Sequence, residues 1–386
     1  MKANHKNPKR YQASKTICQI LKKKEPWIFR SHLSSAAEVF ETGDWLKLVD
    51  GDNKTVGYGI YERDGLIAIR MLSYGEKTPD SKYFKTLLNR AIEKRKNLSR
   101  FASAYRLIHG ENDGFPGVVI DNYNSHWVLQ TYSSTVDALG RWIVRELQKT
   151  LNPTSVTWKL PTKRLKSKKE TRFLLSKPSS EVSFQEGKIK FTVNLIEGQK
   201  SGTFLDLRGL RKWISVEKLN GKRVLNLFSY TGTLGLAAEI AGAKEVWNVD
   251  ISEEALKYAK KHHVLNEKKH KFTAFDIFKW LPTLPADEKF DLIIVDPPNM
   301  GSDISQVKNT LRVYEKLWRG ALSHLAPTGK IVVCCCTSRV SRQEFFLNAK
   351  RVFFSIPLKL VKDFSPEDDH PVNFSQGDYL KILAFG

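Results

Sequence analysis

Short apolar runs separated by turn residues fill the first part of the chain, from about residue 27 to residue 72. Apolar and polar side chains alternate in the runs at 45–49, 57–61 and 66–71. Such alternation, with a period of two residues, is typical of half-buried strands. We therefore predict a small β-barrel domain over residues 1–76.

Helical and strand-like patterns are mixed in the next part of the chain. The spacing of apolar residues is helical over 83–92 and 136–151. Strand-like runs lie at 106–108, 117–120 and 155–158. A mixture of this kind is typical of an α+β domain. We place this central domain at residues 77–185.

Strands and helices alternate regularly from about residue 222 onward. Apolar runs predict strands at 223–227, 245–249, 271–275, 290–295 and 330–336, with helices between them, notably at 233–240 and 252–265. This order predicts βαβ units and a mostly parallel sheet. The final run, 379–385, has no helix behind it, so we expect the sheet to end on a hairpin. Residues 186–386 are assigned to this α/β domain.

The charge balance indicates an acidic partner. The chain has 386 residues, and 63 Lys and Arg against 41 Asp and Glu give a net charge of +22. Basic clusters at 22–24, 94–96, 163–169 and 268–271 are spread over the whole chain rather than gathered in a tail. This distribution favours a folded surface that meets the phosphates of a nucleic acid. The alternative is a basic surface that is merely solvated.

Composition limits the class of protein and its compartment. With 41% apolar and 11% aromatic residues the chain should be globular. No apolar run approaches the roughly 18 residues of a membrane-spanning helix, and residues 1–10 are basic and polar, so we expect neither secretion nor membrane insertion. The four cysteines are Cys18 and the adjacent Cys334, Cys335 and Cys336. They can build neither a disulfide framework nor a paired-CxxC zinc site, so we expect no metal and a reducing cytoplasm.

Unusual residues follow each predicted strand of the α/β domain, and ligands of open α/β sheets bind at such strand ends. The segment 226–235 (Asn-Leu-Phe-Ser-Tyr-Thr-Gly-Thr-Leu-Gly) follows the first strand and opens a helix. Gly232 and Gly235 would leave room for a ligand carboxylate at the amino terminus of that helix, where free N–H groups favour an anion. A tight structural turn could have the same sequence.

Two single aspartates follow the second and third strands. Asp250 comes eighteen positions after Gly232, close to the spacing of about 20 at which an acidic residue binds ribose hydroxyls. A helix cap is the alternative, although Ser252 is well placed for that role. Asp276 lies beside apolar side chains and could accept from the amino group of a purine. It could equally be a helix N-cap.

The fourth and fifth strands end in residues that suit chemistry on a flat ring. Asp296 is followed by Pro297 and Pro298, which fix φ and make the loop rigid. Because side chains alternate across a strand, Cys334 and Cys336 should share one face and Cys335 the other. Two of these three cysteines are expected to fill the core. Cys336, at the end of its strand, should face the same crevice as Asp296, where a thiolate could act as a nucleophile.

Together these motifs resemble a known family, the class I S-adenosylmethionine-dependent methyltransferases. Within it they are similar to the bacterial and archaeal enzymes that methylate carbon 5 of cytosine in large-subunit ribosomal RNA and carry an amino-terminal PUA domain. The resemblance covers nearly the whole chain and rests on the segments 25–29, 110–117, 199–208, 226–232 and 296–298, on Cys336 and on 369–371. Two places depart from the family pattern. Asn299 replaces the usual lysine, and Cys334 and Cys335 stand where cysteine is not usual.

The resemblance implies a Rossmann-like methyltransferase sheet, a PUA-like RNA-binding domain and S-adenosylmethionine as cofactor. It implies that the cofactor is held by Phe228, Ser229, Tyr230, Gly232, Asp250, Asp276 and Asp296 and bordered by Phe204, Asp206 and Arg208. The substrate would meet Pro297, Pro298 and Asn299, and the basic segment would bring Lys163, Lys166, Lys168 and Lys169 to the RNA. Ribosomal RNA is the implied partner, and the sequence leaves a homodimer open.

The chemistry of cytosine supports roles for Cys336 and Asp296. Carbon 5 is a poor nucleophile, and attack of a thiolate on carbon 6 turns the ring into an enamine whose carbon 5 can take a methyl group. Asp296 would bind the ring nitrogen and the amino group and stabilise the charge that develops there. The base that removes the carbon 5 proton could be Asp296, His370 or a water molecule.

Two alternatives come from other functional classes. Exocyclic-amine methyltransferases use a similar Asp-Pro-Pro tip without a cysteine, but they usually stack the base on a Tyr or Phe in the place of Asn299. An inactive RNA-binding or ribosome-assembly protein is the other alternative. The presence of Asp250, Asp296 and Cys336 argues against it.

Overall fold

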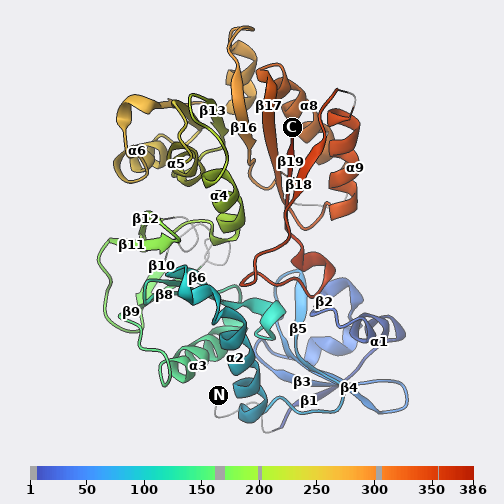
Figure 1. The fold of residues 1–386 in the computed structure, drawn as a ribbon. Coiled ribbons are helices and arrows are strands. Elements are labelled where there is room, and N and C mark those ends of the chain that lie inside the picture. The colour runs from blue at the N-terminus through green and yellow to red at the C-terminus, as the bar shows by residue number, and fades with distance from the viewer. Residues whose placement is uncertain (1–6, 161–169, 199–201, 301–306, 355) are drawn as a thin grey trace. The chain divides into compact units, whose positions relative to one another are not determined.

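The computed structural model describes residues 7–160, 170–198, 202–300, 307–354 and 356–386. The chain folds into two compact units (Figure 1). The first consists of residues 1–187, 193–203 and 368–374, and the second of residues 188–192, 204–367 and 375–386. The predicted domain boundaries at residues 76 and 185 stay a prediction.

A five-stranded sheet opens the first unit. Its strands are β1 (Lys9–Gln12), β3 (Trp45–Val49), β4 (Thr55–Tyr61), β5 (Ile67–Tyr74) and β2 (Trp27–Phe29), in that order. Helix α1 (Lys15–Lys22) begins after Ser14, whose hydroxyl accepts from the N–H of Ile17. Ile17 is buried against apolar residues of the sheet. The β domain predicted from the alternating pattern is confirmed.

A second five-stranded sheet completes the first unit. Its order is β10 (Glu170–Phe173), β9 (Ser155–Leu160), β8 (His126–Thr131), β7 (Val118–Tyr123) and β6 (Ala104–His109). β8 and β9 run parallel and are joined through α3 (Asp137–Leu147). Helix α2 (Ser81–Arg95) shares a core with both sheets of this unit, because Phe84 and Leu88 pack in the same cluster as Ile60 of β4 and Ile120 of β7. The predicted α+β organisation is confirmed.

A short hairpin lies where the chain leaves the first unit. It consists of β11 (Glu181–Glu186) and β12 (Ile189–Asn194), which form a two-stranded sheet.

The second unit is built on a seven-stranded sheet. Its order is β15 (His270–Ala274), β14 (Glu245–Asp250), β13 (Arg223–Leu227), β16 (Phe290–Val295), β17 (Leu325–Cys336), β19 (Leu380–Phe385) and β18 (Leu360–Asp363). β13 to β17 run parallel, whereas β19 is antiparallel to both β17 and β18. The α/β fold and its closing hairpin are therefore as predicted. The order of strands along the sheet reverses between β13 and β16, and that crevice is where ligands of such sheets bind.

Helices follow most strands of this sheet (Figure 1). They are α4 (Arg208–Ser215), α5 (Thr233–Ile240), α6 (Glu253–His262), α7 (Ile277–Trp280), α8 (Val307–Leu322) and α9 (Arg342–Phe353). α5 contacts β13 and β14, while α8 and α9 contact each other and the β17–β19 end of the sheet. Trp318 of α8 and Phe345 of α9 are fully buried with Phe290 of β16 in the main core.

Candidate functional site

The turn after β13 has an unusual backbone. Phe228 and Tyr230 adopt φ values of +60° and +47°, which are uncommon for residues other than glycine and cost energy. The turn is held from β14, because the N–H of Ser229 donates to the Val249 carbonyl at 3.0 Å. Gly232 has φ +73° and precedes the first residue of α5. A backbone forced into this shape places its N–H groups and side chains at the sheet crevice.

One polar atom of this turn is left for a ligand. The hydroxyl of Ser229 is buried and has no hydrogen-bond partner among the described residues. A buried hydroxyl without a partner is costly, so a bound polar group would stabilise it. Gly235, in contrast, has a structural reason to be glycine. A Cβ there would lie 2.5 Å from Oδ1 of Asn248.

Asp250 ends β14 beside the same turn. Its Oδ2 accepts from the N–H of Tyr230 at 2.8 Å, and its Oδ1 accepts from the N–H of Ser252 at 2.9 Å. The N-cap of α6 is Ser252, whose hydroxyl accepts from the N–H of Ala255. The helix-cap alternative for Asp250 is therefore not what the structure shows. Each carboxylate oxygen keeps a lone pair that could accept from a diol.

Asp276 does cap a helix. It precedes α7, and its Oδ1 accepts from the N–H of Phe278 at 3.0 Å. Three large apolar side chains nearby on these strand ends are exposed, namely Ile251 at 74%, Phe275 at 50% and Phe278 at 41%. The rings of Phe228 and Phe278 meet edge to face at 6.0 Å. Exposed apolar side chains grouped in this way are typical of a binding surface for a flat ring.

Sequence reasoning missed Ile251 at this edge. The available signal was a large apolar residue directly after the strand-end Asp250, in a position that a buried strand does not require.

Of the residues predicted to border the cofactor, Phe204 and Asp206 lie between β12 and α4, and Arg208 is the first residue of α4. The rings of Phe204 and Tyr230 are 5.5 Å apart, edge to face. Asp206 accepts from the hydroxyl of Tyr379 at 2.5 Å. Arg208 is buried and donates to Glu367 at 3.1 Å. These bonds fix the two charged side chains. Tyr379 is a second residue that sequence reasoning did not identify.

Asp296 and Cys336 meet at the ends of adjacent strands. Asp296 follows β16, is partly exposed and is joined to β13 through its N–H and the Leu227 carbonyl. Cys336 ends β17, and its Sγ lies 3.5 Å from Oδ1 of Asp296. Pro297 is buried, whereas Pro298 and Asn299 are exposed. A thiol and a carboxylate are thus presented together at an edge that solvent can reach.

The other two cysteines of β17 are fully buried. Burial raises the pKa of the Cys334 thiol well above its ordinary value, and the negative charge of Asp296 adds to this shift. Cys335 points into the main core near Tyr314, and burial raises its pKa as well. Of the three cysteines only Cys336 is partly exposed. A raised pKa leaves little thiolate at neutral pH, so neither buried thiol is prepared for attack.

Lys381 forms hydrogen bonds that hold the turn after Cys336. It lies opposite Cys335 in the β17–β19 ladder and is fully buried. Its Nζ donates to the carbonyls of Thr337 at 2.6 Å and Asp378 at 2.7 Å. Burial lowers its pKa. Sequence reasoning overlooked this residue, although a lone lysine in the apolar run 380–385 was a signal.

The motifs 110–117 and 369–371 come together in the first unit, because Arg95 donates both to Asp113 and to the carbonyl of Asp369. The rings of His109 and His370 are 5.1 Å apart, and Nδ1 of His370 lies 3.0 Å from Asp369. The second carboxylate oxygen of Asp369 accepts from the N–H of Arg106 at 2.8 Å. Lys163, Lys166, Lys168 and Lys169, predicted to meet the RNA, lie outside the described residues.

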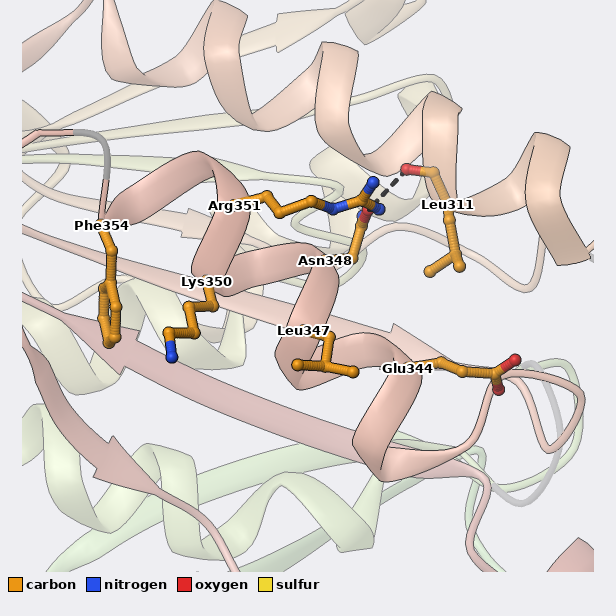
Figure 2. Close-up of a pocket in the computed structure, with 7 residues that line it drawn as sticks. All are labelled: Leu311, Glu344, Leu347, Asn348, Lys350, Arg351 and Phe354. Carbon is orange, nitrogen blue, oxygen red and sulfur yellow. Dashed lines mark hydrogen bonds between the residues drawn. The ribbon is translucent and has the colours of Figure 1, made fainter.

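A separate cavity of about 640 Å³ lies on α8 and α9 (Figure 2). It is lined by Leu311, Glu344, Leu347, Asn348, Lys350, Arg351 and Phe354, and none of these is a predicted site residue. Within the described ranges, no group of His, Cys, Asp or Glu side chains could hold a metal ion. No described helix has the length and apolarity needed to cross a membrane.

Family models and curated relatives match most of the chain. A model of S-adenosylmethionine-dependent methyltransferases matches residues 155–375, and a model of PUA-like domains matches residues 18–74. A ribosomal RNA large subunit methyltransferase I of Tolumonas auensis is 32% identical, over 94% of this chain and 96% of that protein. A ribosomal RNA large subunit methyltransferase of Deinococcus radiodurans is 29% identical, over 97% and 96%.

Solved structures share the fold over the full length. A crystal structure of a chain assigned as a methyltransferase, complexed with SAH, superposes with a TM-score of 0.84 at 22% identity and covers 98% of this chain and 99% of that one. A chain from Streptococcus mutans assigned as an S-adenosylmethionine-dependent methyltransferase gives a TM-score of 0.83 with the same identity and coverage.

Proposed function

The chain belongs to the S-adenosylmethionine-dependent methyltransferase family, and from this premise we propose that it methylates carbon 5 of a cytosine in large-subunit ribosomal RNA. The observation that carries the proposal is the 3.5 Å approach of the Cys336 thiol to Asp296 at the exposed ends of β17 and β16. The curated relatives, which match over nearly their whole length, are ribosomal RNA large subunit methyltransferases, and this supports an RNA substrate. The net charge of +22 agrees with a polyanionic partner.

The residues after β13, β14 and β15 fit the cofactor. The buried hydroxyl of Ser229 needs a polar partner, and the Asp250 carboxylate can accept from both hydroxyls of a ribose. Ile251 and Phe278 are exposed apolar side chains that could enclose an adenine, with Asp276 near its amino group. When bound, the cofactor supplies an electrophilic methyl group on a sulfonium.

Cys336 would act as the nucleophile. Its thiolate attacks carbon 6 of the cytosine, so an S–C bond forms and the electron pair of the 5,6 double bond moves toward carbon 5. Carbon 5 then takes the methyl group. Loss of the carbon 5 proton to a base restores the double bond and expels the thiolate. The protein therefore returns to its starting state after each turnover.

Asp296 would bind the pyrimidine on its Watson–Crick edge. A carboxyl group there can hold a proton at ring nitrogen 3 and accept from the exocyclic amine. Negative charge develops on that side of the ring only after the thiolate has added. The interaction is thus stronger in the transition state than in the ground state, which is what accelerates a reaction.

Nucleoside analysis tests the proposal. Purified protein is incubated with S-adenosylmethionine and unmodified large-subunit ribosomal RNA, and the RNA is digested to nucleosides for mass spectrometry against authentic standards. We expect 5-methylcytidine, and none in a reaction without the protein. A product methylated on an exocyclic amine would contradict the proposal and favour the exocyclic-amine methyltransferases. In that case Asp296 and Asn299 would form hydrogen bonds with the amino group.

A further inference from the structure

A second cavity lies entirely within the first unit, and no step of the proposed reaction uses it. It has a volume of about 400 Å³, within the roughly 300–1,000 Å³ range of small-ligand sites. It is formed where β5 and the segment after α1 meet α2, the turn after β6 and the segment 373–374. Its lining residues are Lys24, Pro26, Tyr74, Leu87, Arg90, Ala91, Lys94, Glu111, Asn112, Asp113, Gly114, Asn373 and Phe374.

Cations at the rim give the cavity a positive charge. Arg90 and Lys94 are exposed and lie one turn apart on α2, and Lys24 is exposed after α1. In the described part of the chain, neither Arg90 nor Lys24 has a carboxylate within ion-pair distance. The spacing of four residues places Arg90 and Lys94 on the same helix face, so both can reach one phosphate.

The two carboxylates of the cavity are already neutralised. Asp113 receives both terminal nitrogens of the buried Arg95, at 3.0 and 2.7 Å. Glu111 accepts from the indole of Trp27 at 2.7 Å and lies 3.5 Å from the buried Arg70. The exposed Lys94 also lies 3.8 Å from Asp113. An anion entering the cavity therefore meets the unpaired cations Arg90 and Lys24, together with Lys94, and no unpaired acid.

The walls suit a flat, polar ring. Phe374 and Tyr74 provide aromatic surface, and Tyr74 is held in place by donating its hydroxyl to the Lys24 carbonyl at 2.9 Å. Asn373 donates to the backbone carbonyl of Asn112 at 2.6 Å, and the N–H of Asn373 donates to Oδ1 of Asn112 at 2.8 Å. These bonds leave Nδ2 of Asn112 as a donor and Oδ1 of Asn373 as an acceptor, without partners among the described residues. A donor and an acceptor beside aromatic surface can pair with the edge of a nucleobase.

We propose that this cavity binds one unpaired nucleotide of the RNA substrate, with its base against Phe374 and its phosphate on Arg90 and Lys94. The inference rests on the proposed function for the identity of the RNA, but the cavity is built only from residues of the first unit. Base stacking and phosphate contacts together are typical of single-stranded RNA recognition. Such a site would anchor the RNA by a nucleotide other than the one methylated.

A probe without cytosine separates this inference from the methylation chemistry. The full-length protein is titrated with a fluorescent octamer of uridines that carries one 4-thiouridine. We expect Arg90→Ala with Lys94→Ala to weaken binding about tenfold or more and to lower the slope of log K against log salt by about 0.7, the value for one lost phosphate contact on single strands. Phe374→Ala should weaken binding about tenfold without changing that slope, and Phe374→Tyr, which keeps the ring, should restore it.

A charge-matched variant serves as the control. Lys82→Ala with Lys85→Ala removes the same charge from α2, from positions that do not line the cavity, and should bind like the parent protein. Irradiation should crosslink the thiouridine to the cavity wall at 373–374 or Tyr74. No measurable binding of the octamer, equal losses in both double variants, or crosslinks only elsewhere would overturn the inference. Failure to form 5-methylcytidine while these results hold would overturn only the proposed function.

Discussion

At the scale of single residues, the proposed cofactor site depends on which hydrogen-bond acceptors are engaged within the protein and which are left for a ligand. Asp250 uses each carboxylate oxygen once, for the N–H groups of Tyr230 and Ser252. The same carboxylate therefore shapes the turn after β13 and remains able to accept from a ribose. The sequence indicated the role through the spacing from Gly232, but it could not show that the carboxylate also holds the turn.

Replacing Asp250 by Asn should weaken the binding of S-adenosylmethionine. The amide keeps the size of the side chain but loses the charge and one acceptor. Loss of a charged hydrogen-bond acceptor costs about 1.5–3 kcal/mol, equivalent to a ten- to hundredfold higher Kd. Titration calorimetry measures this directly. Ser252→Ala, which removes the cap of α6, should lower stability by about 1 kcal/mol while leaving the Kd nearly unchanged, and an unchanged Kd in Asp250→Asn would remove Asp250 from the cofactor site.

At the scale of elements, some strand and helix boundaries were predicted exactly, as for α5 (Thr233–Ile240), and others were missed by several residues. The strands Arg223–Leu227 and Phe290–Val295 begin and end where the apolar runs do, because both are buried on two faces. β17 begins at Leu325, five residues before the predicted start, since 326–329 (Ala-Pro-Thr-Gly) has the composition of a turn. α6 ends at His262 rather than at residue 265. The helix is followed there by His263, whose ring bonds to the turn residue Thr231 and to Thr192 of β12, a tertiary constraint with no local pattern.

His263 should make the stability of the second unit depend on pH. Its Nδ1 donates to the Thr231 carbonyl at 2.5 Å, and its Nε2 lies 3.3 Å from the N–H and 3.0 Å from the carbonyl of Thr192. Burial outweighs the hydrogen bonds to these two carbonyls, which raise its pKa. Burial lowers its pKa to about 4, and the nearby charges of His262 and Arg211 act in the same direction. An unfolded histidine takes up its proton near pH 6.5. The contribution of His263 to the free energy of unfolding should therefore be complete above pH 6.5. It should fall by about 3 kcal/mol as the pH drops toward 4.

Urea titrations at a series of pH values measure this dependence. We expect His263→Gln, which can still donate and accept but cannot titrate, to flatten the curve between pH 6.5 and 4. His262→Gln is the matched control, since His262 is the adjacent residue and its ring lies at a tilt against Tyr258, with centroids 4.4 Å apart. If the free energy of unfolding falls as steeply with pH in His263→Gln as in the parent, then other titrating groups cause the loss of stability.

At the scale of the whole molecule, charge determines the partner. A net charge of +22 from clusters along the chain gives a field that a polyanion neutralises at many points. A candidate cofactor site could be predicted from the sequence because each of the strands that border it is followed by a recognisable residue. The cavity on α2 could not, because its walls come from segments up to 350 residues apart that only the fold brings together.

Replacing Lys166, Lys168 and Lys169 by Ala should weaken binding of ribosomal RNA at moderate salt and reduce the salt slope, because each lost phosphate contact releases fewer counterions. Binding of S-adenosylmethionine should not change. Lys149, Lys257 and Lys260 form a control set, because each is already paired with a glutamate and none belongs to a basic cluster. Filter binding from low to moderate salt measures both triple variants. Equal affinity of the 166–169 variant and the parent would show that this segment is only a solvated surface.

The most direct test of the central claim is trapping of the covalent adduct between Cys336 and RNA that carries 5-fluorocytidine. Fluorine at carbon 5 cannot leave as a proton does, so the S–C bond to carbon 6 persists and can be located by mass spectrometry. We expect the parent protein, Cys334→Ser and Cys335→Ser to form the adduct at residue 336 in the presence of S-adenosylmethionine. Cys336→Ser should form none and should lose methyl transfer. Methyl transfer by Cys336→Ser at a rate near that of the parent, or an adduct on another cysteine, would contradict the account.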